Sequence, residues 1–368
     1  MRKQRQVVFP EAATMFWRCE QQGALKFFGP RGLRLPCARF RIPLSAMRIG
    51  FLTDASLTAL DWAKQNGFGS IAWVAFPDSF AAPGKERWRE DSERFAAEAK
   101  ARDIRISAIG ALYKNPLDPK QTEFAGRVFQ RAVEVAALIG VRTVSGFAGA
   151  VIEVTQNERG GNPVYQPSEA SLPRLLEFWE PLARYAAERG VRIAFEHCPQ
   201  GQFHLPVMHY NFLGQVAMWE RFFNATKCEN LGIEWDASHL MCQFVDPVAN
   251  IHQFGAKVFH VHAKDAFINR TLLEAYGICH PGVAEHRWPG FGQANWAEII
   301  HALLRAGYDS DLNLEGWHDP VLRDHADAPP PSDLALATGS RQAGRKLEQS
   351  GQLLAKKWLE QFVPRMKD

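Results

Sequence analysis

Four apolar segments in the second half of the chain each end in a carboxylate or an imidazole. The terminal residues are Glu196, Asp236, His262 and Glu315. A charged side chain at the end of a buried segment needs a partner, and one divalent cation would serve all four. Each residue alone could instead cap a helix or join an ion pair, but four in succession favour a metal site.

Three carboxylates and one imidazole form a hard, oxygen-rich donor set. Such a set suits Mn²⁺, our first choice, or Mg²⁺ or Co²⁺ better than a zinc site built from thiolates, and Zn²⁺ stays open. We therefore expect one divalent metal ion as the cofactor. The chain has no G-x-G-x-x-G after its first apolar run and no P-loop, so we expect no nucleotide cofactor.

Side chains alternate along a strand, and this alternation ranks the neighbours of the four residues. His260 shares a strand face with His262, and Glu234 shares one with Asp236. Because both lie deeper in their strands, we expect His260 to be a hydrogen-bonded core residue. Glu234 is a candidate supporting group behind the metal site.

The elements that must position these residues alternate between short apolar runs and amphipathic stretches. The runs predict strands at 47–53, 69–75, 104–110, 141–146, 191–196, 231–236, 257–262 and 310–315. The amphipathic stretches predict helices at 56–66, 88–101, 119–139, 169–189, 208–223, 245–254, 294–306 and 338–361. Gly140 and Gly190 each follow a predicted helix and precede a β-branched residue, as expected of a helix end that leads into a strand.

Eight strands that alternate with eight helices predict an α/β fold. Short, nearly continuous apolar strands indicate a parallel sheet covered by helices, and a (β/α)₈ TIM barrel fits this pattern. A doubly wound open sheet is the alternative. In a barrel the C-terminal ends of the strands meet at one rim, which long loop segments at 76–87, 147–168, 197–207 and 263–293 would surround.

The two ends of the chain lie outside the repeating pattern. Residues 1–46 carry nine Lys/Arg against two Glu and lack the apolar core of a signal peptide. We interpret them as a non-barrel extension, disordered or produced by a misassigned start, with a single barrel domain at 47–368. The C-terminal helix at 338–361 should pack on the last strand or on a neighbouring subunit, through Leu347, Leu353, Leu354, Trp358 and Phe362.

Composition narrows the class of protein further. The chain is 46% hydrophobic and 23% charged, as a globular protein is, and it has no apolar run long enough for a membrane helix. Its net charge of +3 comes from the N-terminal segment, so we expect no nucleic-acid partner. Six cysteines without a C-x-x-C pair predict free thiols and a cytoplasmic protein. A homo-oligomer stays open.

Several short motifs together resemble a known family. They are Phe195-Glu196, Asp236-x-x-His239, Val261-His262-x-Lys264-Asp265, the run from His286-Arg287 to Asn295-Trp296, and Leu314-Glu315. The stretch 47–320 that carries them resembles the xylose isomerase-like TIM barrels of the sugar phosphate isomerase and epimerase family. The resemblance covers most of the chain and does not name one member.

The resemblance implies roles for individual residues. It places four residues in the metal-ligand positions: Glu196, Asp236, His262 and Glu315. It places His239 and Arg287 in substrate-contact positions, and His286 adjoins Arg287 in the same motif. Trp317, two residues after Glu315, is a further candidate because an indole ring can stack on a sugar.

The chain also departs from the family pattern in two places. His197 stands where many relatives have Asn, which adds a candidate acid or base. The segment 266–288 is longer than in compact epimerases and resembles a lid or substrate loop. The further metal ligands of endonuclease IV-like relatives are not evident, which disfavours a nuclease.

The implied reaction is proton abstraction next to a carbonyl, with a metal-stabilised enediolate. Glu196 and Glu315 would be both ligands and acid/base groups, and His197 and Lys264 would be auxiliary acids. For Lys264 a salt bridge with Asp265 is an equal alternative. The substrate would be a non-phosphorylated sugar, polyol, cyclitol or keto-sugar. The function that we expect first is that of an isomerase or epimerase. The alternatives are a dehydratase or lyase on an inosose or 3-keto-glycoside, a non-catalytic sugar-binding barrel, and an endonuclease IV-like nuclease.

Overall fold

The computed structural model describes residues 47–155, 164–167, 170–199, 211–278, 280–323 and 347–364, with backbone alone for 153–155 and 164–167. The predictions for 1–46 lie outside these residues and stay predictions. The same holds for the starts of the helices predicted at 208–223 and 338–361.

Eight parallel strands form a closed barrel, which confirms the predicted TIM-barrel architecture. They follow chain order around the barrel, and the last pairs with the first through Ile49 and Leu312. The bounds are Ile49–Thr53 (β1), Ser70–Trp73 (β2), Arg105–Leu112 (β3), Thr143–Phe147 (β4), Arg192–Glu196 (β7), Leu231–Asp236 (β8), Val258–Ala263 (β9) and Leu312–Leu314 (β12). Every predicted strand is present, within two residues at most bounds.

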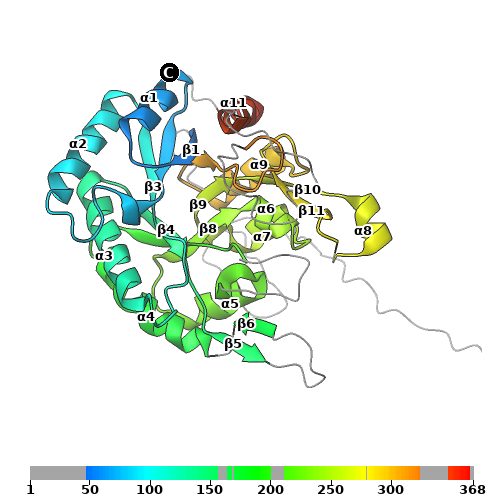
Figure 1. Cartoon of the computed structure of the whole chain (residues 1–368), viewed down its shortest axis with the longest axis horizontal. Helices are drawn as coiled ribbons and strands as arrows, with labels where there is room; N and C mark the ends of the chain where they lie inside the picture. The colour runs from blue at the N-terminus through cyan, green and yellow to red at the C-terminus, as the bar shows by residue number, and fades with distance from the viewer. Residues whose placement is uncertain are drawn as a thin grey trace, which may run out of the picture. The chain divides into compact units, whose positions relative to one another are not determined.

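Helices cover the outside of the barrel, and Figure 1 shows α1 to α4 following one another around it. The bounds are Leu57–Gln65 (α1), Trp88–Ala101 (α2), Thr122–Ile139 (α3), Ser171–Ala187 (α4), Val216–Ala225 (α5), Pro247–Phe254 (α7), Trp296–Ala306 (α9) and Leu347–Leu359 (α11). Gly140 and Gly190 have φ angles of 76° and 69° after α3 and α4, the left-handed conformation that ends a helix.

The sequence pattern missed several short elements. They are two antiparallel hairpins, Ile152–Thr155 (β5) with Val164–Pro167 (β6) and Asp265–Ile268 (β10) with Ala284–Arg287 (β11), two short helices, Ala237–Met241 (α6) and Arg270–Tyr276 (α8), and 3₁₀ turns at Phe76–Asp78, Phe212–Gly214 and Gly255–Lys257. The predicted loop at 266–288 is thus largely the second hairpin, with α8 at its outer end (Figure 1). Short hairpin strands lack a long apolar run, so composition gives little sign of them.

Strand alternation decides which side chains reach the barrel interior. In β7, Phe195 packs outward against Trp179 of α4 and Phe222 of α5, with ring centroids 4.7 Å and 5.7 Å away. Glu196, the next residue, therefore points inward. The apolar contacts between strands and helices hold β7 in place, and β7 directs the Glu196 carboxylate into the barrel.

The C-terminal helix α11 packs beside β1 and β12, as the sequence predicted, and Phe362 just after it contacts the core, but three of the five predicted side chains are exposed. It buries mainly small or polar residues: Gly351, Gln352, Ala355 and Leu359. The predicted contacts Leu353, Leu354 and Trp358 are between 36% and 48% exposed. A close approach explains this difference, because a Cβ atom on Gly351 would lie 2.4 Å from the indole of Trp288.

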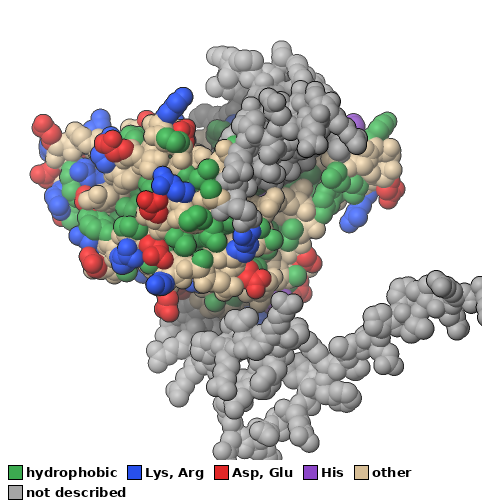
Figure 2. All heavy atoms as spheres, turned by 90° about the horizontal axis from the view of Figure 1, so that it is seen from below, with side chains coloured by type: hydrophobic (Ala, Val, Ile, Leu, Met, Phe, Trp, Pro, Cys, Tyr) green, Lys and Arg blue, Asp and Glu red, His purple; other side chains and the backbone are tan. Residues whose placement is uncertain are grey.

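The surface of the described residues carries charges of both signs. Figure 2 shows Lys and Arg interspersed with Asp and Glu on one face of the molecule. Within the residues that the structure describes, no helix has the length and hydropathy that a membrane crossing requires.

Candidate metal and substrate site

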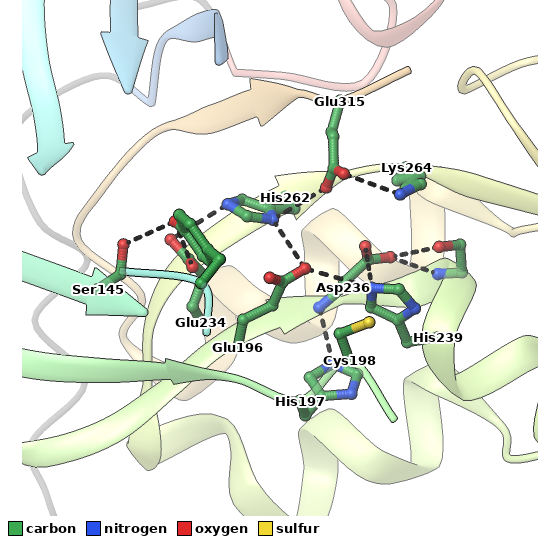
Figure 3. A network of polar contacts seen from close by, with 12 residues as sticks. Ser145, Glu196, His197, Cys198, Glu234, Asp236, His239, His262, Lys264 and Glu315 are labelled. Atoms are coloured by element: carbon green, nitrogen blue, oxygen red, sulfur yellow. Dashed lines mark hydrogen bonds and ion pairs between the residues drawn. The ribbon is translucent and has the colours of Figure 1, made fainter. Parts of the chain in front are cut away.

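The four residues predicted as metal ligands converge at the C-terminal rim of the barrel (Figure 3). One donor atom from each of Glu196, Asp236, His262 and Glu315 lies within 4.8 Å of the others. The sheet brings them together because β7, β8, β9 and β12 are consecutive neighbours and each residue lies at, just before or just after the end of its strand. Direct pairing of Asp236 with His262 in adjacent strands sets the register.

Three potential metal-binding atoms of this group lack hydrogen-bond partners among the described residues. Asp236 Oδ2, His262 Nδ1 and Glu315 Oε2 are buried, and within the described part of the chain none makes a hydrogen bond. His262 Nδ1 lies 3.0 Å from Glu315 Oε2 and 3.5 Å from Glu196 Oε1. Buried polar atoms are normally satisfied. These three atoms face one another without hydrogen bonds. Carboxylate oxygens and an imidazole nitrogen are atoms that bind divalent cations, so the group fits a metal site.

Lys264 partners Glu315 and keeps it ionised. Its Nζ lies 2.8 Å from Glu315 Oε1, which leaves Oε2 free to face His262. Burial alone would raise the pKa of Glu315, but the charges of Lys264 and His262 outweigh burial and hold the pKa well below its ordinary value. The predicted alternative, a salt bridge from Lys264 to Asp265, is wrong. The Asp265 carboxylate instead accepts hydrogen bonds from the backbone of Ala266 and Ala294.

The carboxylates of Glu196 and Asp236 differ in their surroundings. Burial favours the protonated form of both. At Glu196, contacts with His239 and His262 outweigh burial and lower the pKa, whereas at Asp236 burial dominates and raises it. Asp236 also begins α6, where its Oδ1 accepts the backbone N–H and the hydroxyl of Ser238, both at 2.7 Å. Asp236 thus has a fixed orientation, but the nearby charges of His239 and Lys264 do not outweigh its burial.

His239, predicted as a substrate contact, lies beside the four residues. The short helix α6 places it one turn after Asp236. Its Nε2 is 3.2 Å from Glu196 Oε1 and 3.3 Å from Asp236 Oδ2. His239 is therefore close enough to touch any molecule that contacts the carboxylates.

His197 is buried beside β8 and is already engaged by the backbone. Its Nε2 accepts the N–H of Asp236 at 2.9 Å, and its ring packs edge-on against Trp219. Burial lowers the pKa of His197 well below its ordinary value, so the ring is neutral. An accepting Nε2 leaves only Nδ1 to carry a proton, and the role of His197 as an acid stays a prediction.

The remaining predicted substrate residues lie farther out on the rim. His286, on β11, shares a hydrogen bond of 2.9 Å between its Nδ1 and Ser238 Oγ, which ties the hairpin to Asp236. Arg287 pairs with Glu285. Trp317 is 57% exposed, and Arg323 lies over its ring at 4.2 Å. The structure thus connects His286 to the four residues but places Arg287 and Trp317 in contacts of their own.

A buried polar layer beneath the four residues was largely missed from the sequence. Glu234 contacts His260 and Tyr113, and Tyr113 contacts Ser145. The strand alternation pointed to Glu234 and to a hydrogen-bonded His260, and both have these contacts. No sequence signal pointed to Tyr113, which follows β3 and reaches the layer from the opposite side of the barrel.

Comparison with known proteins now identifies the family. The family model described as "Xylose isomerase-like TIM barrel" matches residues 60–339. The chain belongs to this family. Among curated proteins, the uncharacterized protein YfiH of Bacillus subtilis (strain 168) is 26% identical over 254 residues, 61% of this chain and 75% of YfiH.

Solved structures of the xylose isomerase-like fold agree with the barrel described above. D-psicose 3-epimerase from Clostridium cellulolyticum H10, solved with D-tagatose, has a TM-score of 0.57 at 14% identity, over 86% of this chain and 99% of that one. The IOLI protein, solved with a bound zinc atom, has a TM-score of 0.56 at 15% identity, over 87% and 100%. At these identities the likeness shows the fold.

Proposed function

We propose that the protein is a divalent-metal-dependent isomerase or epimerase of a sugar, cyclitol or keto-sugar. The observation that carries this proposal is the convergence of Glu196, Asp236, His262 and Glu315 at the barrel rim, where the last three each present a buried atom without a hydrogen bond among the described residues. In TIM barrels the residues that do chemistry come from the C-terminal ends of several strands. A purely structural charge network would satisfy these atoms within the protein.

The proposed ligands are three carboxylates and the Nδ1 of His262, a donor set that suits Mn²⁺ first and Mg²⁺, Co²⁺ or Zn²⁺ as alternatives. A bound divalent ion would stabilise negative charge on substrate oxygen atoms when a proton leaves the neighbouring carbon. The rest of the chemistry belongs to the side chains of the chain itself.

Glu196 and Glu315 are the proposed proton carriers. Both pKa values are lowered, so both groups are ionised near neutral pH and can accept a proton. They come from different strands, β7 and the end of β12, so they can approach a substrate from different directions. One would take a proton from the carbon next to the carbonyl and the other would return it, with Lys264 holding Glu315 in place.

The proposed substrate contacts are His239, His286, Arg287 and Trp317. His239 lies among the carboxylates and is the best placed to bind a hydroxyl group of the substrate. His286 and Arg287 belong to the β10–β11 hairpin, so the substrate would contact this hairpin after entering the rim. Trp317 offers an exposed ring for stacking.

The similar structures support this choice of reaction class. One is named as an epimerase of a ketose and was solved with a ketose, and another carries a zinc atom. A lyase that eliminates water from a keto-sugar or inosose would use the same carboxylates. The experiment must therefore distinguish proton exchange from loss of water.

The first test is the metal content of protein purified without added metal. Wild type is compared with Glu196→Gln/Glu315→Gln and with the surface control Glu123→Gln/Glu177→Gln, whose carboxylates are largely exposed. We expect about one ion per chain in wild type and control and loss in the site variant. No ion in the wild type after reconstitution with Mn²⁺, Mg²⁺, Co²⁺ and Zn²⁺ would overturn the proposal.

The second test follows deuterium from solvent into ketoses, keto-glycosides and inososes. Metal-dependent exchange at the carbon next to the carbonyl, absent from the site variant, supports an isomerase or epimerase. Loss of water from the substrate instead identifies the lyase. A ligand that binds without exchange or elimination indicates a sugar-binding barrel.

A further inference from the structure

A second group of buried residues lies directly beneath the proposed ligands and is centred on Glu234. The carboxylate of Glu234 is fully buried. Its Oε1 is 2.7 Å from His260 Nδ1 and 3.1 Å from His262 Nε2, and its Oε2 accepts the hydroxyl of Tyr113 at 3.0 Å. None of the proposed catalytic steps uses Glu234, so the presence of this carboxylate in the barrel interior needs another explanation.

His262 connects the two layers through its two ring nitrogens. Nδ1 faces Glu315 Oε2 at 3.0 Å, whereas Nε2 faces Glu234 Oε1 at 3.1 Å (Figure 3). An imidazole can bind a metal only through a nitrogen without a proton, and the proton then sits on the other nitrogen. A carboxylate beside Nε2 stabilises the proton there and leaves the lone pair of Nδ1 directed at the other ligands.

The geometry of Glu234, His260 and His262 also admits a second metal ion, since one donor atom from each lies within 4.8 Å of the others. The hydrogen bonds of these residues instead favour a structural role for the group. Both ring nitrogens of His260 are engaged, with Glu234 and with Asn313 Oδ1 at 2.9 Å, and both oxygens of Glu234 have polar neighbours. Hydrogen bonds therefore hold Glu234 and His260 in place, and Glu234 Oε1 faces His262 Nε2 at an ion-pair distance of 3.1 Å. His262 Nε2 makes no hydrogen bond among the described residues.

We propose that Glu234 is a positioning residue that fixes the tautomer and the orientation of His262 for metal binding through Nδ1. This inference rests on the proposed metal site. Carboxylates that hold a metal-binding histidine from behind commonly contribute 10-fold to 100-fold in metal affinity. Glu234 is in turn held by His260 and Tyr113, so the orientation of His262 depends on side chains from β3, β8 and β9.

The test compares Zn²⁺ and Co²⁺ affinity in wild type and Glu234→Gln by competition with a chelator. The variant Asp309→Asn is the control, because Asp309 lies at the opposite end of the barrel. We expect Glu234→Gln to weaken binding by about 10-fold to 100-fold and to change the visible spectrum of bound Co²⁺. Asp309→Asn should change neither, and a folded Glu234→Gln with wild-type affinity and spectrum would overturn the inference.

The outcomes separate the inference from the proposed function. A wild type that binds no metal overturns both. A wild type that binds one ion equally well with Gln at position 234 overturns the positioning role alone. Two ions per wild-type chain, one of them lost in Glu234→Gln, would make the lower layer a second metal site.

A measurement on wild type covers the case in which Glu234→Gln does not fold. Histidine nitrogens labelled with ¹⁵N report which ring atom carries the proton in the Zn²⁺-loaded protein. Repeating the measurement in His239→Gln removes the other imidazole near the carboxylates. We expect the histidine that responds to Zn²⁺ to be protonated at Nε2 and bound through Nδ1. Binding through Nε2 would overturn the proposal.

Discussion

Asp309 at the N-terminal end of the barrel and Asp236 at the C-terminal rim have opposite surroundings. At the N-terminal end, Asp309 lies 2.7 Å from a guanidinium nitrogen of Arg142 and 2.9 Å from one of Arg192. These charges outweigh burial and lower the pKa of Asp309. At the C-terminal rim, burial dominates and raises the pKa of Asp236. Asp309 is thus stabilised by two guanidinium groups, whereas Asp236 keeps an oxygen without a hydrogen bond in the described part of the chain.

This difference separates a structural ion pair from a candidate site more clearly than residue type does. Arg192 crosses beneath the strands, where it also donates to the carbonyl of Phe259 and to the hydroxyl of Thr143. The Arg192 guanidinium therefore has its charge partner and its hydrogen-bond acceptors within the chain. At the rim, Asp236 Oδ2 and Glu315 Oε2 make no hydrogen bond within the described residues. Asp311 Oδ2, near the N-terminal end, is unpaired in the same way, so one such oxygen is not enough. Several unpaired atoms that converge, as they do at the rim, indicate function, because leaving them unpaired costs stability.

The largest expected effect comes from Asp236→Asn. The amide keeps an oxygen for Ser238 but removes a charged ligand, so metal affinity should fall by at least about 100-fold, more than for loss of a supporting group. Because the pKa of Asp236 is raised on folding, its charge destabilises the metal-free fold near neutral pH. Urea unfolding of chelator-treated protein should therefore show equal or greater stability. A loss of more than about 2 kcal/mol would instead mark Asp236 as structural.

Arg192→Met should have the opposite profile. It removes the charge that faces Asp309 and leaves the carbonyl of Phe259 without this donor, so the free energy of unfolding should fall by about 2 kcal/mol. Metal affinity of the folded protein should stay at the wild-type value, as chelator competition would show. A matched loss of metal affinity would contradict the separation between the two ends of the barrel.

The sequence was sufficient for the barrel because local patterns encode it. Apolar runs such as 231–236 end at the same residue as the strand they predict, and Gly140 ends its helix in the left-handed conformation. The hairpin of β10 and β11 was not predicted, because its strands are four residues long and pair only with each other. Formation of this hairpin depends on tertiary contacts such as the one between His286 and Ser238.

The candidate site was predictable where residues end strands and unpredictable where loops and distant strands contribute. Asp236 ends β8 and His262 lies one residue before the end of β9, so barrel topology alone brings them together. Tyr113 follows β3, and nothing in its neighbourhood of the sequence shows that its hydroxyl reaches Glu234. The partner of Lys264 was equally hidden, since Asp265 is adjacent in the chain while Glu315 is 51 residues away.

Acid should lower the free energy of unfolding because His197 is buried at the rim in its neutral form. Burial lowers its pKa in the folded state, so as pH falls below about 6.5 the unfolded chain binds the proton first. Stability should then fall by up to about 1.4 kcal/mol per pH unit until the pH reaches the lowered folded-state pKa. His197→Asn should have a flatter dependence of unfolding free energy on pH between 8 and 5. Parallel curves for wild type and variant would show that His197 takes up its proton in the fold.

The smallest expected effect is that of Tyr113→Phe, and it sharpens the comparison most. The variant leaves every proposed ligand and Glu234 in place. It removes only the hydroxyl group that donates a hydrogen bond of 3.0 Å to Glu234 Oε2. Because Glu234 keeps His260 as a second partner, metal affinity should fall by less than in Glu234→Gln, about 2-fold to 5-fold within the range of a single lost hydrogen bond. Chelator competition with Co²⁺ measures the change, and Tyr185→Phe, which removes a hydroxyl bonded to Glu134 on the outside of the barrel, is the control. An equal effect of the two variants would mean that the layer beneath the rim supports the fold in general, as the N-terminal end does, and does not tune the site.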